Sequence, residues 1–333
     1  MGYITGICNS YNELKSAFVD LCVTAGWGQT TDSNGKTVVY KGSDGLYIMV
    51  EVGALTSAPS TPDCLRILGR TSVNGGDAPT KVGISNFYSS GPGPVTFPVT
   101  FHGFYYSNVN EVYFIIKYNQ MYQFIAFGKS TVLLPGTGLW VAGSVSPHDD
   151  TNSGTDLYRS RPYAIYMTTS GFGYGGTFSD VAPALFWVGV RRDSSSPGPF
   201  SDRNYWVHSN LDASYPWSLS SGDYKGNRVG VAYLSLYFQA QPQQFNKEAF
   251  LMPVLAYKPS NLYSGYYHLV ASLINARHMK INYIDPETVI TKDGEQWVVF
   301  PCFKKMYQNE YWTTAETGST HSGNFGWAVK KEA

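Results

Sequence analysis

The most regular hydrophobic pattern in the chain is a pair of apolar runs separated by two polar residues. Residues 111–118 read EVYFIIKY and residues 121–127 read MYQFIAF, with Asn119 and Gln120 between them. Both runs are rich in β-branched and aromatic residues without a strict polar alternation, which is typical of strands that are buried on both faces. Two polar residues between such runs predict a β-hairpin. The pattern therefore predicts the centre of a buried sheet.

A helical pattern occurs near the start of the chain. Ser10 and Glu13 form a Ser-x-x-Glu capping box, which satisfies backbone N–H groups at a helix N-terminus. Apolar residues follow at helical spacing, namely Leu14, Phe18, Leu21 and Cys22. Gly26 is suited to the position after the helix, because glycine adopts the left-handed conformation at little cost. We therefore predict one helix over residues 11–25.

Strand patterns recur along the rest of the chain, between segments rich in Gly, Pro and Ser. We predict strands at residues 37–41, 46–52, 64–68, 163–168, 184–190, 228–239, 250–257, 266–274, 289–290 and 296–303. Hairpin turns are predicted at residues 42–45 (GSDG) and 293–294 (DG), and loops at residues 74–98 and 191–227. The fold class is therefore mostly β (α+β), with antiparallel sheets in sandwich- or barrel-like modules and one N-terminal helix.

A polar, turn-rich segment at residues 144–154 is the candidate boundary between domains. It predicts an N-terminal domain of residues 1–143, which holds the helix and β-hairpins, and a β-rich domain of residues 144–333 with long aromatic loops. One large domain is the alternative, because a chain of 333 residues suits either arrangement.

Composition narrows the class of protein. Charged residues make up 14% of the chain, and Lys+Arg and Asp+Glu are both 24, so the formal net charge is zero. Disorder requires high charge and few aromatic residues, whereas aromatic residues make up 16% here. The basic excess that is typical of nucleic-acid binding is also missing. Because charged residues are depleted at the centres of protein–protein interfaces, the composition favours assembly with other proteins.

The sequence offers weak support for catalysis or cofactor binding. Residues 171–176 (GFGYGG) match G-x-G-x-x-G, but Pro183 would break the helix that a dinucleotide fold needs next. The cysteines form no metal-binding motif and are expected to be reduced, buried thiols. They are Cys8, Cys22, Cys64 and Cys302. No apolar run is long enough to span a bilayer, so we expect no membrane span. From the composition and the missing motifs, we expect no nucleic-acid partner, no cofactor, no metal, no catalytic residues and no enzymatic activity.

The segment 191–227 carries aromatic residues suited to contact a partner. These residues are Tyr205, Trp206, Tyr215, Trp217 and Tyr224. Aromatic side chains on loops stack on sugar rings or anchor protein interfaces. The alternative is that these rings fix the loop to its own domain. We treat the five residues as candidate contacts to a neighbouring protein or to a host surface glycan.

Three short stretches are similar to segments of one class of protein. They are residues 283–286 (YIDP) with 296–301 (QWVVFP), residues 322–330 (SGNFGWAVK) and residues 122–129 (YQFIAFGK). Each resembles a stretch of tailed-bacteriophage structural proteins, whose C-termini place a Gly-aromatic-Ala-Val/Ile run before a basic tail. The resemblance carries no catalytic motif and assigns no functional residue. It implies a virion component of the tail or baseplate, made in the host cytoplasm.

We therefore expect a non-enzymatic structural component of a tailed-bacteriophage virion, in the tail tip or baseplate. It would act by assembly with other virion proteins and with copies of itself. One alternative is a receptor- or glycan-binding module on the tail, and another is a collar or capsid-decorating protein. A glycan hydrolase of the same particle is a third possibility, for which the sequence supplies no motif.

Overall fold

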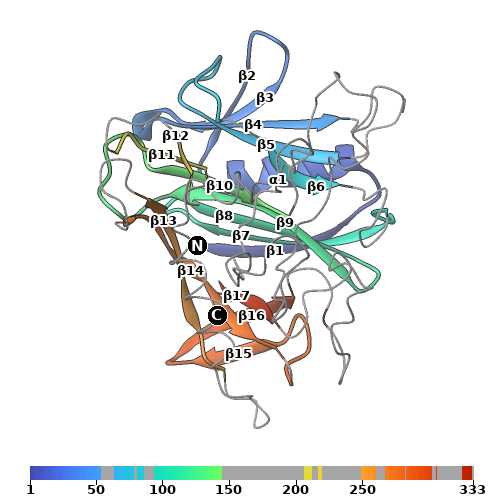
Figure 1. Cartoon of the computed structure of the whole chain (residues 1–333). Helices are drawn as coiled ribbons and strands as arrows, with labels where there is room; N and C mark the ends of the chain where they lie inside the picture. The colour runs from blue at the N-terminus through green and yellow to red at the C-terminus, as the bar shows by residue number, and fades with distance from the viewer. Residues whose placement is uncertain are drawn as a thin grey trace, which may run out of the picture.

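The computed structural model describes residues 1–53, 64–78, 81–85, 94–144, 206–211, 217–219, 249–259, 267–281, 283–301, 305 and 325–331. Within these ranges the chain forms three antiparallel sheets, one α-helix and one short 3-10 helix (Figure 1). The sheets are open and sandwich-like, so the predicted mostly β class is confirmed.

The central sheet has seven strands. In spatial order they are β1 (Gly2–Cys8), β7 (Val99–Tyr106), β8 (Glu111–Tyr118), β9 (Met121–Lys129), β10 (Leu139–Gly143), β11 (Trp206–His208) and β12 (Trp217–Leu219). The N-terminal sheet consists of β2 (Gly28–Thr31), β3 (Thr37–Lys41), β4 (Leu46–Gly53), β5 (Cys64–Arg70) and β6 (Val82–Ser85). The C-terminal sheet has the order β13 (Met252–Pro259), β14 (Tyr267–Lys280), β17 (Phe325–Lys331), β16 (Glu295–Pro301) and β15 (Val289–Lys292).

The central sheet lies between the other two sheets (Figure 1). Helix α1 (Tyr11–Thr24) packs between the central and N-terminal sheets, and its Phe18 ring lies 5.5 Å from that of Phe114. On the opposite face, Phe124 of β9 lies 5.0 Å from Trp327 of the C-terminal sheet. A single hydrophobic cluster includes residues from all three sheets and the helix. The central sheet is therefore covered by apolar side chains on both faces.

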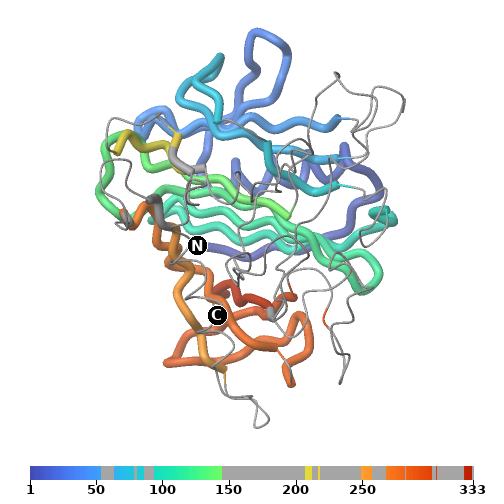
Figure 2. Tube along the Cα trace, viewed as in Figure 1, coloured from blue at the N-terminus to red at the C-terminus, as the bar shows by residue number. Residues whose placement is uncertain are grey.

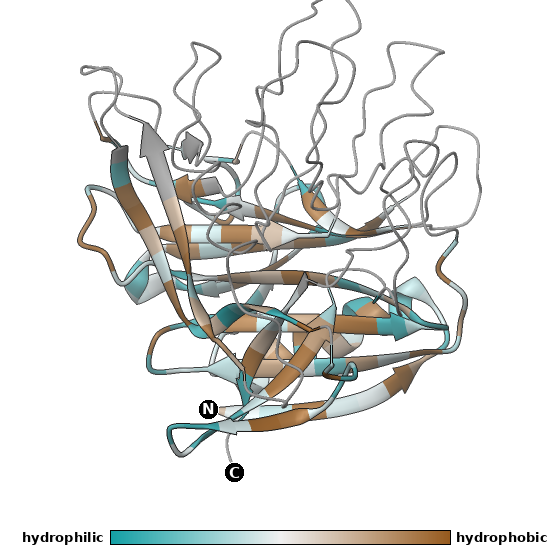
Figure 3. Ribbon diagram, turned by 60° about the horizontal axis from the view of Figure 1, so that its bottom comes forward, coloured by the Kyte–Doolittle hydropathy of each residue, from teal (hydrophilic) through white to brown (hydrophobic). Residues whose placement is uncertain are grey.

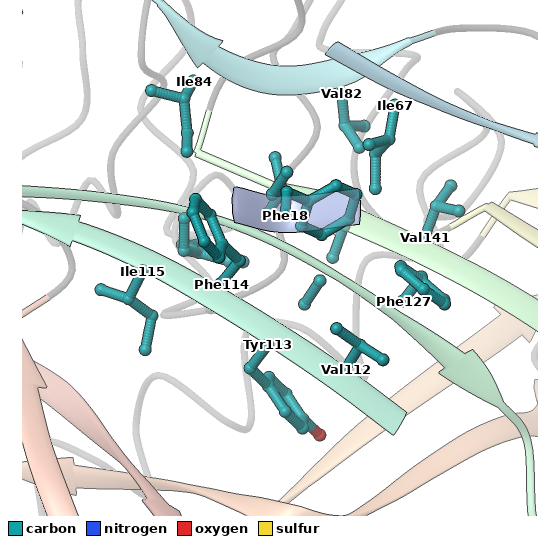
Figure 4. Packing of buried hydrophobic residues seen from close by; sticks show 14 of the residues in the cluster. Phe18, Ile67, Val82, Ile84, Val112, Tyr113, Phe114, Ile115, Phe127 and Val141 are labelled. Carbon is teal, nitrogen blue, oxygen red and sulfur yellow. The ribbon is translucent and has the colours of Figure 1, made fainter. Parts of the chain in front are cut away.

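The hairpin β8–β9 occupies the middle of this arrangement, as its sequence predicts. Every residue of β8 except Lys117, and every residue of β9 except Lys129, is buried. Successive side chains of a strand point to opposite faces, and Figure 4 shows Phe114 directed toward Phe18 of the helix while Tyr113 points away from it. The hairpin thus contributes to both hydrophobic layers, which explains why its sequence lacks polar alternation.

Helix α1 follows the predicted pattern with an end at Thr24 instead of residue 25. The Glu13 N–H donates to Ser10 Oγ at 3.2 Å, which confirms Ser10 as the N-cap. At the other end, Gly26 has a φ of 83° and its N–H donates to the Val23 carbonyl. The next N–H, that of Trp27, donates to the Cys22 carbonyl, which completes a Schellman motif.

Several strands are not predicted by the sequence pattern. The predicted loop 74–98 contains β6, and the predicted loop 191–227 contains β11 and β12, so both predictions are corrected. Strands β1, β2, β7, β10 and β17 are further elements that the pattern does not indicate. These strands are short, glycine-containing or irregular in hydrophobicity, and they are stabilised by pairing with neighbours that are distant in sequence.

Strand β1 illustrates how the fold overrides a weak local preference. Its glycines lower the propensity for a strand. A Cβ atom at Gly2 would lie 2.6 Å from the Tyr105 ring, and one at Gly6 would lie 2.7 Å from the Phe101 ring. Aromatic rings of β7 therefore occupy the space beside both glycines. The marked N and C ends lie near each other in Figures 2 and 3, and at the end of β17 Lys331 Nζ is 5.0 Å from the Tyr3 ring of β1.

The predicted division at residue 143 stays a prediction. Strands β11 and β12 lie beyond that boundary, yet they extend the central sheet beyond β10. Val141 and Val329 also belong to one hydrophobic cluster. The predicted strands 163–168, 184–190 and 228–239 lie outside the described residues. Of the cysteines, Cys8, Cys22 and Cys64 are buried free thiols, and Cys302 lies outside the described residues.

Candidate functional site

The five aromatic candidates from the sequence are only partly described by the structure. Tyr205, Tyr215 and Tyr224 lie outside the described residues. Trp206 is the first residue of β11, where it pairs with Val141 and Leu219. Trp217 is the first residue of β12. The contact of these residues with a partner protein or a glycan stays a prediction.

Trp217 makes contacts within its own fold. Its side chain is buried, and its indole N–H donates to the Gly76 carbonyl at 3.1 Å. A Cβ atom at Gly69 would lie 2.8 Å from the same ring, so this glycine provides the space that the indole fills. The His208 ring lies 5.2 Å away. Trp217 therefore attaches β12 to the N-terminal sheet.

A cluster of polar side chains lies where the central and C-terminal sheets meet. It comprises Tyr3 of β1, His102 of β7, Lys117 of β8, Tyr122 of β9 and Glu287, which precedes β15. The first four come from four consecutive strands of the central sheet. We call these five residues the junction cluster. It combines acidic, basic and phenolic groups on one side of the central sheet.

Glu287 is the acceptor at the centre of the junction cluster. Its Oε1 accepts hydrogen bonds from Lys117 Nζ at 2.7 Å and from the Tyr122 hydroxyl at 2.6 Å. The backbone of Glu287 has a φ of 67°, a left-handed conformation that is uncommon for a residue with a side chain. Its N–H donates to the Val299 carbonyl at 2.6 Å. Backbone and side chain thus fix this residue between two sheets.

His102 is the residue of the junction cluster whose side chain ordinarily titrates near neutral pH. It is 6% exposed, and its Nδ1 lies 2.9 Å from the Tyr3 hydroxyl. Its Nε2 lies 3.9 Å from Glu287 Oε1 and makes no hydrogen bond. The ring edge meets Phe300 of β16 at a centroid distance of 5.3 Å. One side of the imidazole is therefore hydrogen-bonded, while the other faces a carboxylate beyond hydrogen-bond distance.

Burial and neighbouring charges shift the pKa values of His102 and Glu287 in the junction cluster. Burial lowers the pKa of His102, although the Glu287 carboxylate acts to raise it and Lys117 acts to lower it. For Glu287, burial acts to raise the pKa, but the hydrogen bonds from Lys117 and Tyr122 outweigh it and hold the pKa below its ordinary value. The folded protein thus favours neutral His102 and ionised Glu287.

The geometry of the junction cluster is that of an ionic clamp between two sheets. A nucleophile–base–carboxylate relay needs successive hydrogen bonds. Here the His102–Glu287 gap of 3.9 Å is too long, and the oxygen nearest the ring already accepts two hydrogen bonds. Because Glu287 belongs to the C-terminal sheet region and its donors belong to the central sheet, the contacts join the two layers. In the part of the chain that the structure describes, no three His, Cys, Asp or Glu side chains could together hold a metal ion.

Acidification is expected to weaken this clamp. The unfolded chain protonates histidine near pH 6.5, whereas the folded pKa of His102 is lower, so the unfolded state binds more protons below about pH 6.5. The free energy of unfolding should therefore decrease as the pH falls from 7 to 5. Each such histidine contributes at most about 1.4 kcal/mol per pH unit. The ionised form of Glu287 adds stability that is lost only below about pH 4.5, as the pH falls through its lowered pKa.

Urea unfolding at several pH values provides the measurement. A His102→Gln variant, which keeps an acceptor for the Tyr3 hydroxyl, should show a smaller decrease between pH 6.5 and 5 than the wild type. His278→Gln is a useful comparison, because burial lowers the pKa of His278 to about 3 and its removal should flatten the profile over a wider range. An identical pH profile for wild type and His102→Gln would contradict the expectation.

The sequence pattern does not identify the junction cluster. Its residues are spread over positions 3 to 287 and form no motif. One usable signal is a polar residue inside an otherwise apolar strand, as with His102 in VTFHGFYY and Lys117 in EVYFIIKY. Pairing of β1, β7, β8 and β9 is what brings four of these residues together.

Beside the junction cluster lies an aromatic layer that joins the same two sheets. Phe124 lies 5.0 Å from Trp327, Phe300 lies 6.0 Å from Trp327, and Tyr122 lies 6.1 Å from Phe300. Trp327 and Phe300 are almost completely buried. We call Tyr122, Phe124, Phe300 and Trp327 the aromatic junction.

Comparison with protein-family models and with curated sequences finds no match. In the described part of the chain, no helix has the length and apolar character that crossing a membrane requires.

Proposed function

We propose that this chain is a non-enzymatic structural component of a tailed-bacteriophage virion, positioned in the tail tip or baseplate. Its role is assembly, through contacts with other virion proteins and with further copies of itself. Low charge, zero net charge and abundant tyrosine support a surface suited to protein–protein contact.

The observation that carries this proposal is the meeting of the stretches that resemble phage structural proteins. Residues 122–129 lie in β9, residues 296–301 in β16, and residues 325–330 in β17. More than a hundred residues of sequence lie between β9 and β16. The three strands nevertheless supply all four rings of the aromatic junction. Their contact supports a shared structural unit as the source of the resemblance.

The chemistry of the neighbouring polar site is consistent with this role. In the junction cluster, the acidic and basic groups are used to hold two sheets together. Such contacts favour a rigid scaffold whose described surface is available for assembly. The proposal therefore assigns the ionisable groups a structural role.

Cryo-electron microscopy of intact particles that contain the chain provides the test. An ordered ring of copies at the tail tip or baseplate is the expected result. Density at the collar or on the capsid would overturn the assigned position. Absence of the chain from purified particles would overturn the virion role, provided that the chain is detected in the infected cells by mass spectrometry.

A further inference from the structure

The free edges of the sheets differ in how well they resist pairing with another strand. An edge strand presents unpaired N–H and C=O groups, and proteins protect such edges by short strands, prolines, charges or bulges. Within the described residues, the edge strands are β1 and β12, β2 and β6, and β13 and β15. Strands β2, β6, β12 and β15 contain four residues or fewer. Strand β13 is longer, but it contains Pro253 and two register irregularities.

Strand β1 lacks each of these protective features. It has seven residues, GYITGIC, with no proline and no charged side chain. Its pairing with β7 runs without a register shift from Gly2 opposite Tyr105 to Cys8 opposite Val99. The rings beside its glycines hold it in a regular conformation. Within the described residues, this edge is therefore suited to pair with another strand.

Exposure of side chains on β1 supports the same conclusion. Ile7 is 68% exposed, so its apolar side chain is accessible at this edge. Thr5 is also exposed, and Tyr3 is partly exposed. These three residues alternate along β1 and therefore lie on one face of the sheet. An apolar and uncharged row thus follows the free edge.

We propose that β1 pairs antiparallel with β1 of a second copy of this chain, across a two-fold axis that passes beside Thr5. This pairing joins two central sheets into one continuous sheet. It places Thr5 opposite Thr5 of the other copy, and Ile7 opposite Tyr3 of the other copy. Threonine pairs and aromatic–β-branched pairs are favourable neighbours across antiparallel strands.

The choice of a second copy follows from charge and symmetry. A two-fold interface brings the same surface of both copies together, so like charges near the axis would repel. Strand β1 itself has no charged side chain to repel its own copy or to select a charged foreign strand. The neighbouring cation, Lys331, lies over Tyr3, two residues along the strand from the axis. The inference gives the assembly role proposed above a specific surface and rests on it for its biological setting. The pairing itself is measured on the isolated full-length chain.

Sedimentation velocity across a range of protein concentrations tests the proposal. The wild-type chain is expected to show a concentration-dependent dimer, with modest affinity because a single strand pair buries a small area. Monomer at every concentration reached would overturn the proposal. This outcome is distinct from failure of the virion role, which depends on the location of the chain in particles.

Charge substitutions at Ile7 test the surface and the register together. Lys331 Nζ already lies 5.0 Å from the Tyr3 ring, so Ile7→Lys would bring a second cation to that ring in the other copy. Dimerisation should weaken by at least about tenfold. Ile7→Glu removes the same apolar side chain but brings a carboxylate toward Lys331, so it should retain more affinity than Ile7→Lys. The opposite order would overturn the proposed register.

A matched control separates the edge from exposed apolar side chains in general. Leu133 is 98% exposed and lies outside β1, so Leu133→Lys introduces the same charge elsewhere. Dimerisation of this variant should equal that of the wild type. Loss of the dimer in Leu133→Lys, with Ile7→Lys unaffected, would overturn β1 as the interface. Circular dichroism and thermal unfolding of both variants confirm that they fold.

Disulfide trapping gives a second, independent measurement. Thr5→Cys should form a covalent dimer under mild oxidation, because the two-fold axis places this residue opposite itself. Val289→Cys, at a partly exposed position on the short edge strand β15, is the control and should stay monomeric. Wild-type chain treated in parallel accounts for the native cysteines. Trapping through Val289→Cys but not through Thr5→Cys would overturn the proposal.

Discussion

Replacing Trp327 with alanine is expected to lower the free energy of unfolding by about 3–5 kcal/mol. The Trp327 ring is 1% exposed and contacts rings from both sheets that meet at the aromatic junction. One of these rings belongs to Phe124 of the central sheet, at 5.0 Å. Alanine removes the apolar area and leaves a cavity that neighbouring strands cannot easily fill, because these strands are held in register by hydrogen bonds.

Urea unfolding monitored by circular dichroism measures this loss. Trp327→Phe retains an aromatic ring and should cost less, about 1–2 kcal/mol. Tyr283→Ala provides a control, because its side chain is about half exposed and the change should stay within about 0.5 kcal/mol. A Trp327→Ala variant as stable as this control would show that the aromatic junction does not hold the two sheets together.

Hydrogen exchange would localise the effect. If Trp327 holds the C-terminal sheet on the central sheet, amide protons of β17 and β16 should exchange faster in Trp327→Ala. Amide protons of β4, in the N-terminal sheet, should change less, because that sheet packs on the other face. An equal change everywhere would indicate general destabilisation instead of local separation of two layers.

The parts of the fold that the sequence predicts are those with strong local signals. Helix α1 is determined by its Ser10 cap, its apolar spacing and the glycine after its end. The β8–β9 hairpin is determined by two apolar runs and by Asn119, whose φ of 53° suits the tight turn. Each signal acts within a few residues, so no knowledge of distant contacts is needed.

The remaining elements depend on distant partners. Strand β1 becomes a strand because it pairs with residues about a hundred positions away, and β17 because it completes the C-terminal sheet between β14 and β16. Glycines interrupt the apolar residues in both strands, so the pattern alone does not distinguish them from loops. Sequence spacing likewise cannot place Tyr3, His102 and Glu287 together.

The aromatic candidates show the same limit. Trp217 is a candidate contact because of its residue type and its position in a predicted loop. Surface contacts and rings that fix a loop share both properties. In the structure its indole N–H donates to Gly76 and its ring fills the space beside Gly69. These two contacts, to residues more than a hundred positions away in sequence, account for its placement. Residue type is therefore a poor guide to whether an aromatic side chain faces outward.

Glu111 is expected to be the most important polar side chain for the C-terminal sheet. Strand β14 bulges where Val254 pairs with Leu273 and Pro253 pairs with Arg277, which leaves residues 274–276 without partners in β13. The N–H groups of Ile274 and Asn275 donate to the Glu111 carboxylate at 3.1 and 3.2 Å. The central sheet thus supplies the acceptors that the bulge lacks.

Two side-chain donors complete the coordination of this carboxylate. Asn275 Nδ2 donates at 2.8 Å and the Tyr113 hydroxyl at 2.9 Å, both to Oε2. Glu111 is fully buried, and burial raises its pKa although these hydrogen bonds act to lower it. All four partners donate hydrogen bonds. An ionised carboxylate can accept all of them, whereas an amide side chain of the same size would place its own N–H donors among them.

Glu111→Ala should therefore destabilise the protein by at least about 3 kcal/mol. Removal of a buried carboxylate recovers its desolvation cost, which can amount to several kcal/mol. Against this gain, four donors, three of them in buried hydrogen bonds, lose their acceptor at about 1–3 kcal/mol each, and a cavity remains. The loss of hydrogen bonds and packing should exceed the gain. Urea unfolding of the variant gives the net change.

Conservative variants distinguish the loss of hydrogen bonds from the loss of volume. Glu111→Gln keeps the size of the side chain but turns an N–H group toward other N–H or O–H donors, so it should also destabilise. Tyr113→Phe removes one of the four donors and should cost about 1 kcal/mol. Glu295→Ala, which removes a partly exposed carboxylate paired with Lys330, should cost less than 1 kcal/mol. If Glu111→Gln were as stable as the wild type, the bulge would not depend on the carboxylate, and the bend in β14 would have to be held by packing alone.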